Sequence, residues 1–135
     1  MATAQALDEE MRARIAEHRA RRVAGWRTME EPLDLAGALS REPETPALVD
    51  CLTLWLANLM LGGQSIRAAA DALEAALDRR LAPTILVANE VGWGIVPDNP
   101  LGRAFRDEAG MLNQRLATRA ERVMLMVAGL PLTVK

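Results

Sequence analysis

The sequence has few of the residues that build disulfides and metal centres. Its 135 residues contain one cysteine, Cys51, and one histidine, His18. A single cysteine excludes an internal disulfide, and its presence fits a reducing compartment. One cysteine and one histidine also exclude a metal site built from several ligands of these two types. We therefore look for chemistry based on carboxylates, arginines or the lone imidazole.

Aromatic residues and lysine are also scarce. Tyrosine is absent, aromatics make up 3% of the chain, and the only lysine is Lys135 among sixteen basic residues. The net charge is −2, so no overall basic field attracts nucleic acid or an anionic membrane surface. The aromatic side chains are too few to form a platform on which RNA bases stack. Excess arginine suits phosphate binding but also follows from GC-rich coding. We predict no nucleic-acid partner.

Two longer signals are missing. No apolar run reaches the length that spans a membrane, and no signal peptide opens the chain, which predicts a cytoplasmic protein. No glycine is followed by lysine, so the phosphate-binding motif GxxxxGK[ST] is absent from these residues. Half of the residues are apolar and a quarter are charged, as in ordinary globular proteins. The length predicts a single domain over residues 1–135.

Periodicity and capping residues predict alternating strands and helices. Asp8 is expected to cap the first helix, Ser65 a later one, and Asn99 or Asp98, followed by Pro100, the last. Continuous apolar runs predict buried strands. The expected helices cover 9–22, part of 30–42, 52–61, 66–82 and 100–120, and the expected strands cover 47–50, 84–90 and 122–130, with 131–135 as a possible edge strand.

This order predicts an α/β fold with a parallel sheet covered by helices. Ligands bind beyond the carboxyl ends of the strands in such sheets. The residues expected there are Asp50, Asn89, Glu90 and Gly129. The glycine-rich loop at 91–99 follows at the same edge, and its Trp93 is able to cover a flat ligand.

His18 is the first candidate functional residue. Helical spacing puts Arg14, Arg21 and Arg22 around its ring, where they would surround a bound phosphate. The alternative is a solvated basic face that complements the helix dipole. A third interpretation, an RNA-binding helix, would require steep salt dependence of RNA affinity. The spacing by itself leaves these alternatives open.

Asp50 is the second candidate. An acid at the end of a buried strand can hold Mg²⁺ or its water shell beside phosphates. It can equally cap the helix that begins near Leu52. Its neighbour Cys51 is expected to be a small buried apolar residue, because no basic partner is close in sequence.

Three stretches together resemble a known family. These are NEVGWGIVPDNPLGRAFRDEAGMLNQRLA (89–117), AEHRARR (16–22) and WRTMEEP (26–32). They resemble the bifunctional adenosylcobinamide kinase / adenosylcobinamide-phosphate guanylyltransferases of cobalamin biosynthesis, and the resemblance extends from Ala2 to Lys135.

The resemblance implies an activity. Enzymes of the family phosphorylate adenosylcobinamide and then transfer GMP from GTP to adenosylcobinamide phosphate, giving adenosylcobinamide-GDP. The transfer passes through a GMP–histidine intermediate, and the family's histidine matches His18. GTP, ATP and Mg²⁺ are the implied nucleotides and metal, with Asp50 near the metal. The positions implied to contact the nucleotide are Ala2, Thr3, Ala4, Gln5, Arg19, Ala20, Arg21, Arg22, Glu30 and Asp50.

The resemblance also implies a fold and an assembly. Family members are similar to RecA-type P-loop NTPases, with three layers and a mostly parallel sheet between helices, and they form homotrimers. In the family, a first strand, a GGxRSGKS phosphate loop and a first helix come before the part of the sequence that matches this chain from Met1 onward. We therefore expect an N-terminally truncated P-loop domain that binds GTP weakly and has little kinase activity. The alternative is a non-catalytic remnant that keeps only the fold or the oligomer interface.

Overall fold

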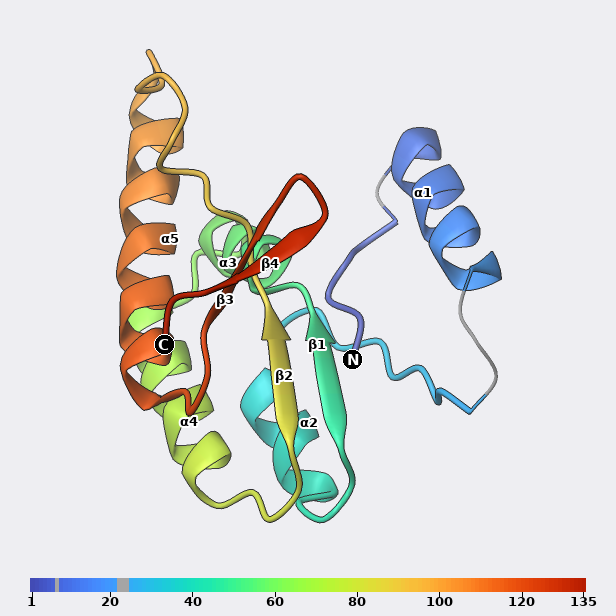
Figure 1. Cartoon of the computed structure of the whole chain (residues 1–135). Helices are drawn as coiled ribbons and strands as arrows, with labels where there is room; N and C mark the ends of the chain where they lie inside the picture. Colours follow the sequence, from blue (N-terminus) through green and yellow to red (C-terminus); the bar gives the residue numbers. More distant parts are fainter. Residues whose placement is uncertain (7, 22–24) are drawn as a thin grey trace. The chain divides into compact units, whose positions relative to one another are not determined.

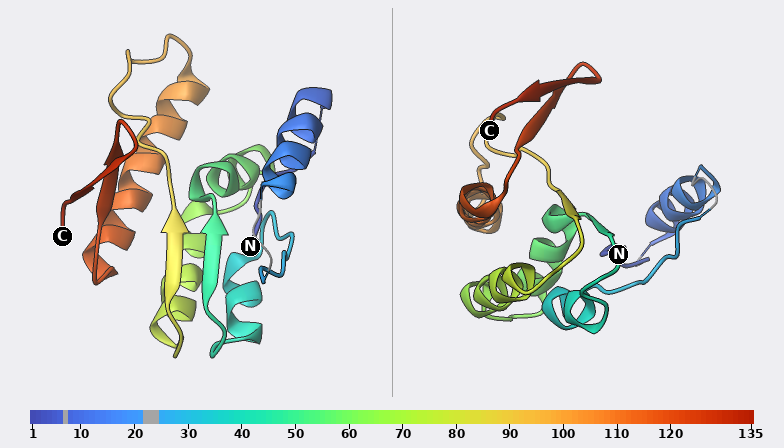
Figure 2. Two further views of the ribbon diagram at one scale, coloured as in Figure 1. Left: turned by 45° about the vertical axis from the view of Figure 1, so that its right-hand side comes forward. Right: turned by 60° about the horizontal axis from the view of Figure 1, so that its bottom comes forward.

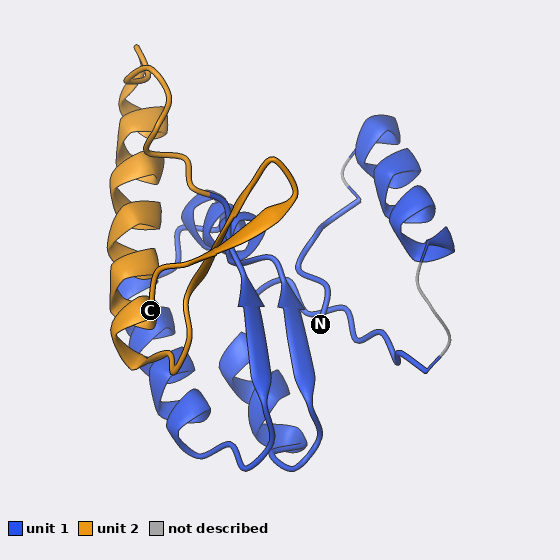
Figure 3. Ribbon diagram, in the orientation of Figure 1, with its two compact units in different colours: residues 1–89 blue, residues 90–135 orange. Residues whose placement is uncertain are grey.

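The computed structural model describes residues 1–6, 8–21 and 25–135. The chain divides into two compact units, unit 1 over Met1–Asn89 and unit 2 over Glu90–Lys135 (Figure 3). Each unit is described by itself below. The predicted single domain over residues 1–135 stays a prediction.

Unit 1 alternates helices and strands, as the sequence predicts (Figure 1). The Asp8 carboxylate caps the first helix by accepting from the Met11 amide at 2.7 Å. The Ser65 hydroxyl likewise accepts from the Ala68 amide at 3.3 Å. These local bonds fix where the two helices begin. The elements are α1 (Glu9–Ala20), α2 (Leu35–Arg41), β1 (Ala47–Asp50), α3 (Leu52–Leu61), α4 (Ile66–Asp78) and β2 (Thr84–Val87).

The sheet of unit 1 is parallel, as predicted. β1 and β2 pair in register from Ala47 with Thr84 to Asp50 with Val87. Helices α2 and α4 lie on one face of this pair (Figure 2) and pack on each other. The side chains that fill this layer are apolar and fully or almost fully buried: Leu35, Ala38, Leu39, Val49, Leu52, Trp55, Leu56, Leu59, Ala70, Leu73 and Ala76.

Two further segments extend the sheet beyond β1. Ala2 forms parallel bridges with both Asp50 and Glu30. The Asp50 amide donates to the Met1 carbonyl at 3.0 Å, and the Glu31 amide donates to the Ala2 carbonyl at 2.9 Å. The order across the sheet is therefore residues 29–31, residues 1–3, β1 and β2.

Unit 2 contains α5 (Pro100–Arg119), β3 (Met124–Val127) and β4 (Leu130–Thr133). Asn99 caps α5 by accepting from the Gly102 amide at 2.7 Å, with Pro100 in the first turn. The prediction of a third parallel strand is wrong, because β3 pairs antiparallel with β4. Ala128 and Gly129 between them have φ of 50° and 79°. Two positive φ angles are typical of the tight turn that closes a hairpin.

The predicted α/β class with a parallel sheet is confirmed, and its details differ in three places. Gly129, predicted at the end of a parallel strand, lies in the turn between β3 and β4. Helix α4 ends at Asp78, before the expected end near residue 82. Helix α1 ends at Ala20, and Arg22 lies outside the described residues. The three-layer RecA-like arrangement stays a prediction.

Candidate functional site

Helix α1 carries His18 in its last turn. Asp8 caps the helix, and Glu9 and Glu10 in the first turn complement the positive end of the helix dipole. No residue of α1 is buried, although Met11 and Ile15 are half-buried. The His18 side chain is 55% exposed. The imidazole is therefore accessible to a ligand from solvent.

The arginines around His18 already have carboxylate partners. Arg14 Nη2 lies 2.6 Å from Glu10 Oε1, and Arg21 pairs with Glu17 one helical turn away. The expectation that both arginines surround a phosphate bound to His18 stays a prediction, and each would have to leave its carboxylate partner to contact that phosphate. Arg22, the third predicted member, lies outside the described residues.

His18 and Asp50 come together, although the sequence presented them as separate candidates. The imidazole Nε2 lies 3.3 Å from Oδ2 of Asp50. Asp50 is the last residue of β1, so its carboxylate stands at the carboxyl end of the parallel sheet. The last turn of α1 reaches this edge, where α/β sheets bind ligands.

Asp50 does not cap the following helix. The N-cap of α3 is Cys51, whose side chain makes no capping hydrogen bond. The alternative interpretation of Asp50 as a cap is therefore wrong, and its carboxylate faces the imidazole. Cys51 is 7% exposed and has a free thiol, as expected for a small buried apolar residue.

Glu30 joins the same edge through Arg19. The two side chains form an ion pair, and both are more than half exposed. Ala2 lies between Glu30 and Asp50 in the extended sheet. Glu30, Ala2 and Asp50, which are all predicted to contact the nucleotide, therefore lie side by side in the sheet. His18 and Arg19 on α1 pair with Asp50 and Glu30.

Thr3 is the buried member of the predicted 2–5 turn. Its side chain is 0% exposed. The Thr3 hydroxyl donates to the Cys51 carbonyl and accepts from the Cys51 amide, each at 2.8 Å. Asn58 Nδ2 donates to the Thr3 carbonyl at 2.8 Å and to the Pro32 carbonyl at 3.1 Å. The hydroxyl is thus engaged inside the protein, whereas Ala4 and Gln5 are half-buried.

Sequence reasoning missed Asn58. It lies on α3 among apolar residues and has no motif around it. Its amide nevertheless joins the segment that contains Thr3 to the segment that follows Glu30. A polar residue within an otherwise apolar helix is the signal that could have indicated it, because such a side chain needs hydrogen-bond partners.

The loop that follows β2 is tied to α5 within unit 2. Arg106 Nη2 donates to the Gly92 carbonyl at 2.8 Å. Arg103 Nη1 donates to the carbonyls of Pro97 and Asp98 at 3.1 and 2.9 Å. Trp93 is 76% exposed, and its contact with a flat ligand stays a prediction. Residues 90–117, nearly all of the family-like stretch, therefore form a loop that is bonded to a helix.

Two surface cavities lie in unit 1, and neither includes His18 or Asp50. One, of about 540 Å³, lies between the first turns of α2 and α4 beside Trp55. The other, of about 360 Å³, lies near the start of β1 and includes Arg27, Glu42 and Arg80. A hydrogen bond from Arg27 lowers the pKa of Glu42, and burial lowers the pKa of Arg80.

The described residues contain no group of three or more His, Cys, Asp or Glu side chains able to hold a metal ion. Asp50 is a single, partly exposed carboxylate. One carboxylate fits Mg²⁺, which keeps most of its water ligands when it binds proteins.

In the same described ranges, no helix has the length and apolar character needed to cross a membrane.

Comparison with known proteins bears out the resemblance. The model of the family described as cobinamide kinase / cobinamide phosphate guanyltransferase matches residues 1–134. The bifunctional adenosylcobalamin biosynthesis protein CobP of Pseudomonas aeruginosa is 53% identical over 139 residues, covering 100% of this chain and 80% of that protein. The corresponding CobU proteins of Salmonella typhimurium and Escherichia coli are each 41% identical over 152 residues, covering 100% of this chain and 84% of theirs. This chain belongs to the cobinamide kinase / cobinamide phosphate guanyltransferase family.

Proposed function

We propose that this chain acts in cobalamin biosynthesis by transferring GMP from GTP to adenosylcobinamide phosphate. The product is adenosylcobinamide-GDP, and the preceding step is phosphorylation of adenosylcobinamide. Family membership and the names of the relatives support the pathway. The contact between His18 and Asp50 at the end of β1 is the observation that best supports the transfer step. GTP, ATP and Mg²⁺ are the nucleotides and metal of the proposed reactions, in the cytoplasm.

His18 is the proposed nucleophile. One nitrogen of its neutral imidazole attacks the α-phosphorus of GTP, an N–P bond forms, and pyrophosphate leaves. A phosphate oxygen of adenosylcobinamide phosphate then attacks the same phosphorus, the N–P bond breaks, and the imidazole is regenerated. The exposure of the His18 side chain supports this role, because both substrates must reach the ring in turn.

The arginines of the last turn would stabilise charge on the phosphate. Arg19, Arg21 and Arg22 are the proposed partners of the oxygens around the attacked phosphorus. Arg19 is held beside His18 by Glu30, whereas Arg21 must first leave Glu17. A phosphate is able to take the place of the Glu17 carboxylate because it too pairs with a guanidinium through two hydrogen bonds.

Asp50 is the proposed anchor of Mg²⁺. The metal would neutralise charge on the leaving pyrophosphate when it is bound. The chain itself contributes a carboxylate at the sheet edge, which also favours positive charge on the neighbouring imidazole as it forms its bond to phosphorus. Ala2, Ala4, Gln5 and Ala20 are proposed to line the nucleotide site, and Thr3, whose hydroxyl is engaged by Cys51, fixes the path of this segment.

Incubation with Mg²⁺ and millimolar GTP labelled at the α-phosphorus tests the proposal. We expect label on the protein that is lost in acid and kept in alkali, as a phosphoramidate is. Mass spectrometry should assign it to His18, and His18→Asn should remove it without abolishing any phosphorylation of adenosylcobinamide. Label that persists in His18→Asn would overturn the assignment.

A non-catalytic role is the second candidate. The 135 residues contain no Gly-Lys pair, and the backbone amides and lysine of such a loop are what hold nucleoside triphosphates in P-loop proteins. A chain that keeps only the fold or the oligomer interface would take up no label at any GTP concentration. The same incubation therefore distinguishes the two candidates.

The proposed assembly is a homotrimer. It rests on the resemblance to the family. Sedimentation equilibrium over a range of protein concentrations should give the mass of three chains, whereas the mass of one chain at every concentration would overturn this assignment.

A further inference from the structure

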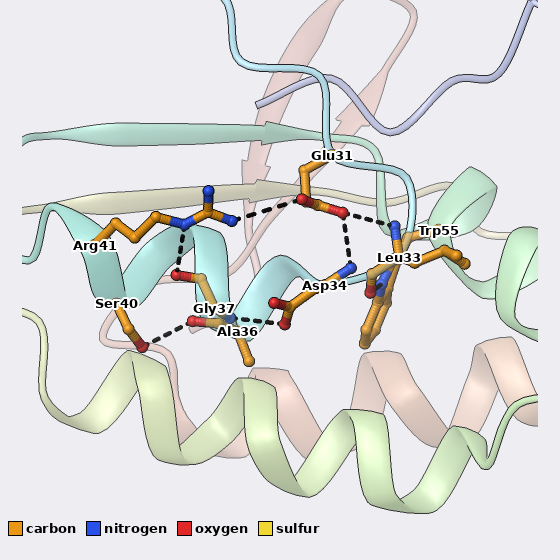
Figure 4. A network of polar contacts seen from close by, with 8 residues as sticks. All are labelled: Glu31, Leu33, Asp34, Ala36, Gly37, Ser40, Arg41 and Trp55. Carbon is orange, nitrogen blue, oxygen red and sulfur yellow. Dashed lines mark hydrogen bonds and ion pairs between the residues drawn. The ribbon is translucent and has the colours of Figure 1, made fainter.

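Glu31 follows Glu30 in the sequence, and its carboxylate bonds to the turn that precedes α2 (Figure 4). Its Oε1 accepts from the amides of Leu33 at 3.2 Å and Asp34 at 2.9 Å. Its Oε2 lies 3.7 Å from Arg41 Nη2, and its side chain is 20% exposed. A carboxylate that accepts two backbone amides fixes the path of the chain between them. Glu31 thus closes the turn that leads into α2.

The same residue is anchored to α2 at both ends of that helix. Asp34 caps α2 by accepting from the Gly37 amide at 2.8 Å. Arg41, in the last turn, donates from Nε to the Gly37 carbonyl at 3.3 Å and pairs with Glu31. Because Leu35 and Leu39 of α2 are 0% exposed, these bonds connect Glu31 to the rigid core of unit 1.

Backbone hydrogen bonds of residues 29–31 set the directions of the Glu30 and Glu31 side chains. The Glu31 amide donates to the Ala2 carbonyl at 2.9 Å, and the Ala2 amide donates to the Met29 carbonyl at 2.8 Å. Successive side chains of an extended segment point to opposite sides. Glu31 is therefore directed toward α2, while the carboxylate of Glu30 pairs with Arg19, next to His18.

We propose that Glu31 is a positioning residue for guanylyl transfer. It fixes residues 29–31 to α2, so that Glu30 holds Arg19 beside His18 before GTP arrives. The inference rests on the proposed function, since it concerns the rate at which His18 takes up GMP. Glu31 itself touches no reacting atom.

A double-mutant cycle with Glu30 tests this role. The measured quantity is the initial rate of label transfer from α-labelled GTP to His18 in the full chain. We expect Glu31→Ala to lower the rate about tenfold in the wild-type background, and less than about twofold in a Glu30→Gln background where the pairing with Arg19 is already gone. Glu31→Gln, which keeps an oxygen for the two amides, should restore most of the rate.

Controls separate positioning from loss of fold. Glu44→Ala removes an exposed carboxylate of the same unit and should leave the rate unchanged. If Glu31→Ala fails to fold, Glu31→Asp keeps the charge and withdraws it from the amides, and should give the same dependence on Glu30. Equal losses in both backgrounds would overturn the positioning role and leave the proposed function standing. A wild-type chain that takes up no label would overturn both.

Discussion

Nε2 of His18, at the end of α1, lies 3.3 Å from Oδ2 of Asp50, at the end of β1. A helix terminus and a strand terminus thus meet at one point of the sheet edge. The contact joins the only histidine of the chain to the one strand-end carboxylate that the sequence singled out. It gives the lone imidazole a partner that can stabilise positive charge on the ring.

Asp50→Asn should slow guanylylation of His18. The change keeps the size of the side chain and removes its charge, so the imidazole loses its electrostatic partner. We expect a loss of about tenfold, which corresponds to roughly 1.4 kcal/mol of transition-state stabilisation. The measurement is the initial rate of label uptake from α-labelled GTP.

Asp107→Asn is the matched control for this change, because Asp107 is exposed on α5 in the other unit. Its rate should equal that of the wild type. An unchanged rate in Asp50→Asn would mean that the contact with His18 has no part in the transfer.

Thr3→Val should destabilise unit 1 although valine has almost the same shape as threonine. The change leaves the buried Cys51 amide without its acceptor, while the Cys51 carbonyl keeps the bond from the Trp55 amide. The expected loss is about 1–3 kcal/mol in the free energy of unfolding. Thr3→Ser keeps the hydroxyl and loses one methyl group, at a cost of about 1 kcal/mol. Urea denaturation followed by circular dichroism compares them, and a serine variant less stable than the valine variant would contradict the argument.

Glu42 should contribute to the acid sensitivity of the fold. The hydrogen bond from Arg27 lowers its pKa in the folded state. The resulting stabilisation is complete above the ordinary glutamate pKa and is lost as pH falls through the lowered folded-state value. Both side chains are in contact with solvent, so the effect should be small and should shrink with added salt.

The comparison that isolates this effect is wild type against Glu42→Gln. The difference in their free energies of unfolding should be largest near neutral pH and should approach zero in acid. A difference that grows as pH falls would contradict the sign of the pKa shift.

Helix starts were predictable from sequence because their causes are local. The side chains of Asp8, Ser65 and Asn99 cap α1, α4 and α5 by bonds to amides three residues ahead. Capping needs only the residue type and the pattern that follows. For the same reason the end of β1 at Asp50 was predictable from the length of the apolar run.

Long-range pairing was not predictable in the same way. Residues 1–3 and 29–31 join the sheet through backbone hydrogen bonds. These bonds do not require the alternating or continuous apolar pattern by which a strand is recognised in a sequence. The strand at Met124–Val127 has the apolar run of a buried strand, yet its partner is decided by the two-residue turn at Ala128 and Gly129. A glycine in that turn was the available signal for a hairpin.

The candidate site was predictable residue by residue but not as an arrangement. His18, Arg19, Glu30 and Asp50 were each named from sequence. The pairing of His18 with Asp50 and of Arg19 with Glu30 comes from the fold. The pairing of Arg14 with Glu10 and of Arg21 with Glu17 follows helical spacing, so the acidic residues one turn earlier could have indicated it. Phosphate binding by these arginines requires an exchange of partners.

Arg106→Gln should loosen the loop at 91–99 without unfolding α5. Arg106 donates to the Gly92 carbonyl, and a hydrogen bond from a charged donor is worth about 1.5–3 kcal/mol. Discounting for partial exposure, we expect amide hydrogen exchange of the loop to become about tenfold faster. Exchange within α5 should not change, because the Asn99 cap and the helix hydrogen bonds are untouched. Arg67→Gln, on the exposed side of α4, is the control and should leave loop exchange as in the wild type. If both variants exchange alike, the contribution assigned to Arg106 is wrong, and the loop is held by other bonds, such as those of Arg103 to the carbonyls of Pro97 and Asp98.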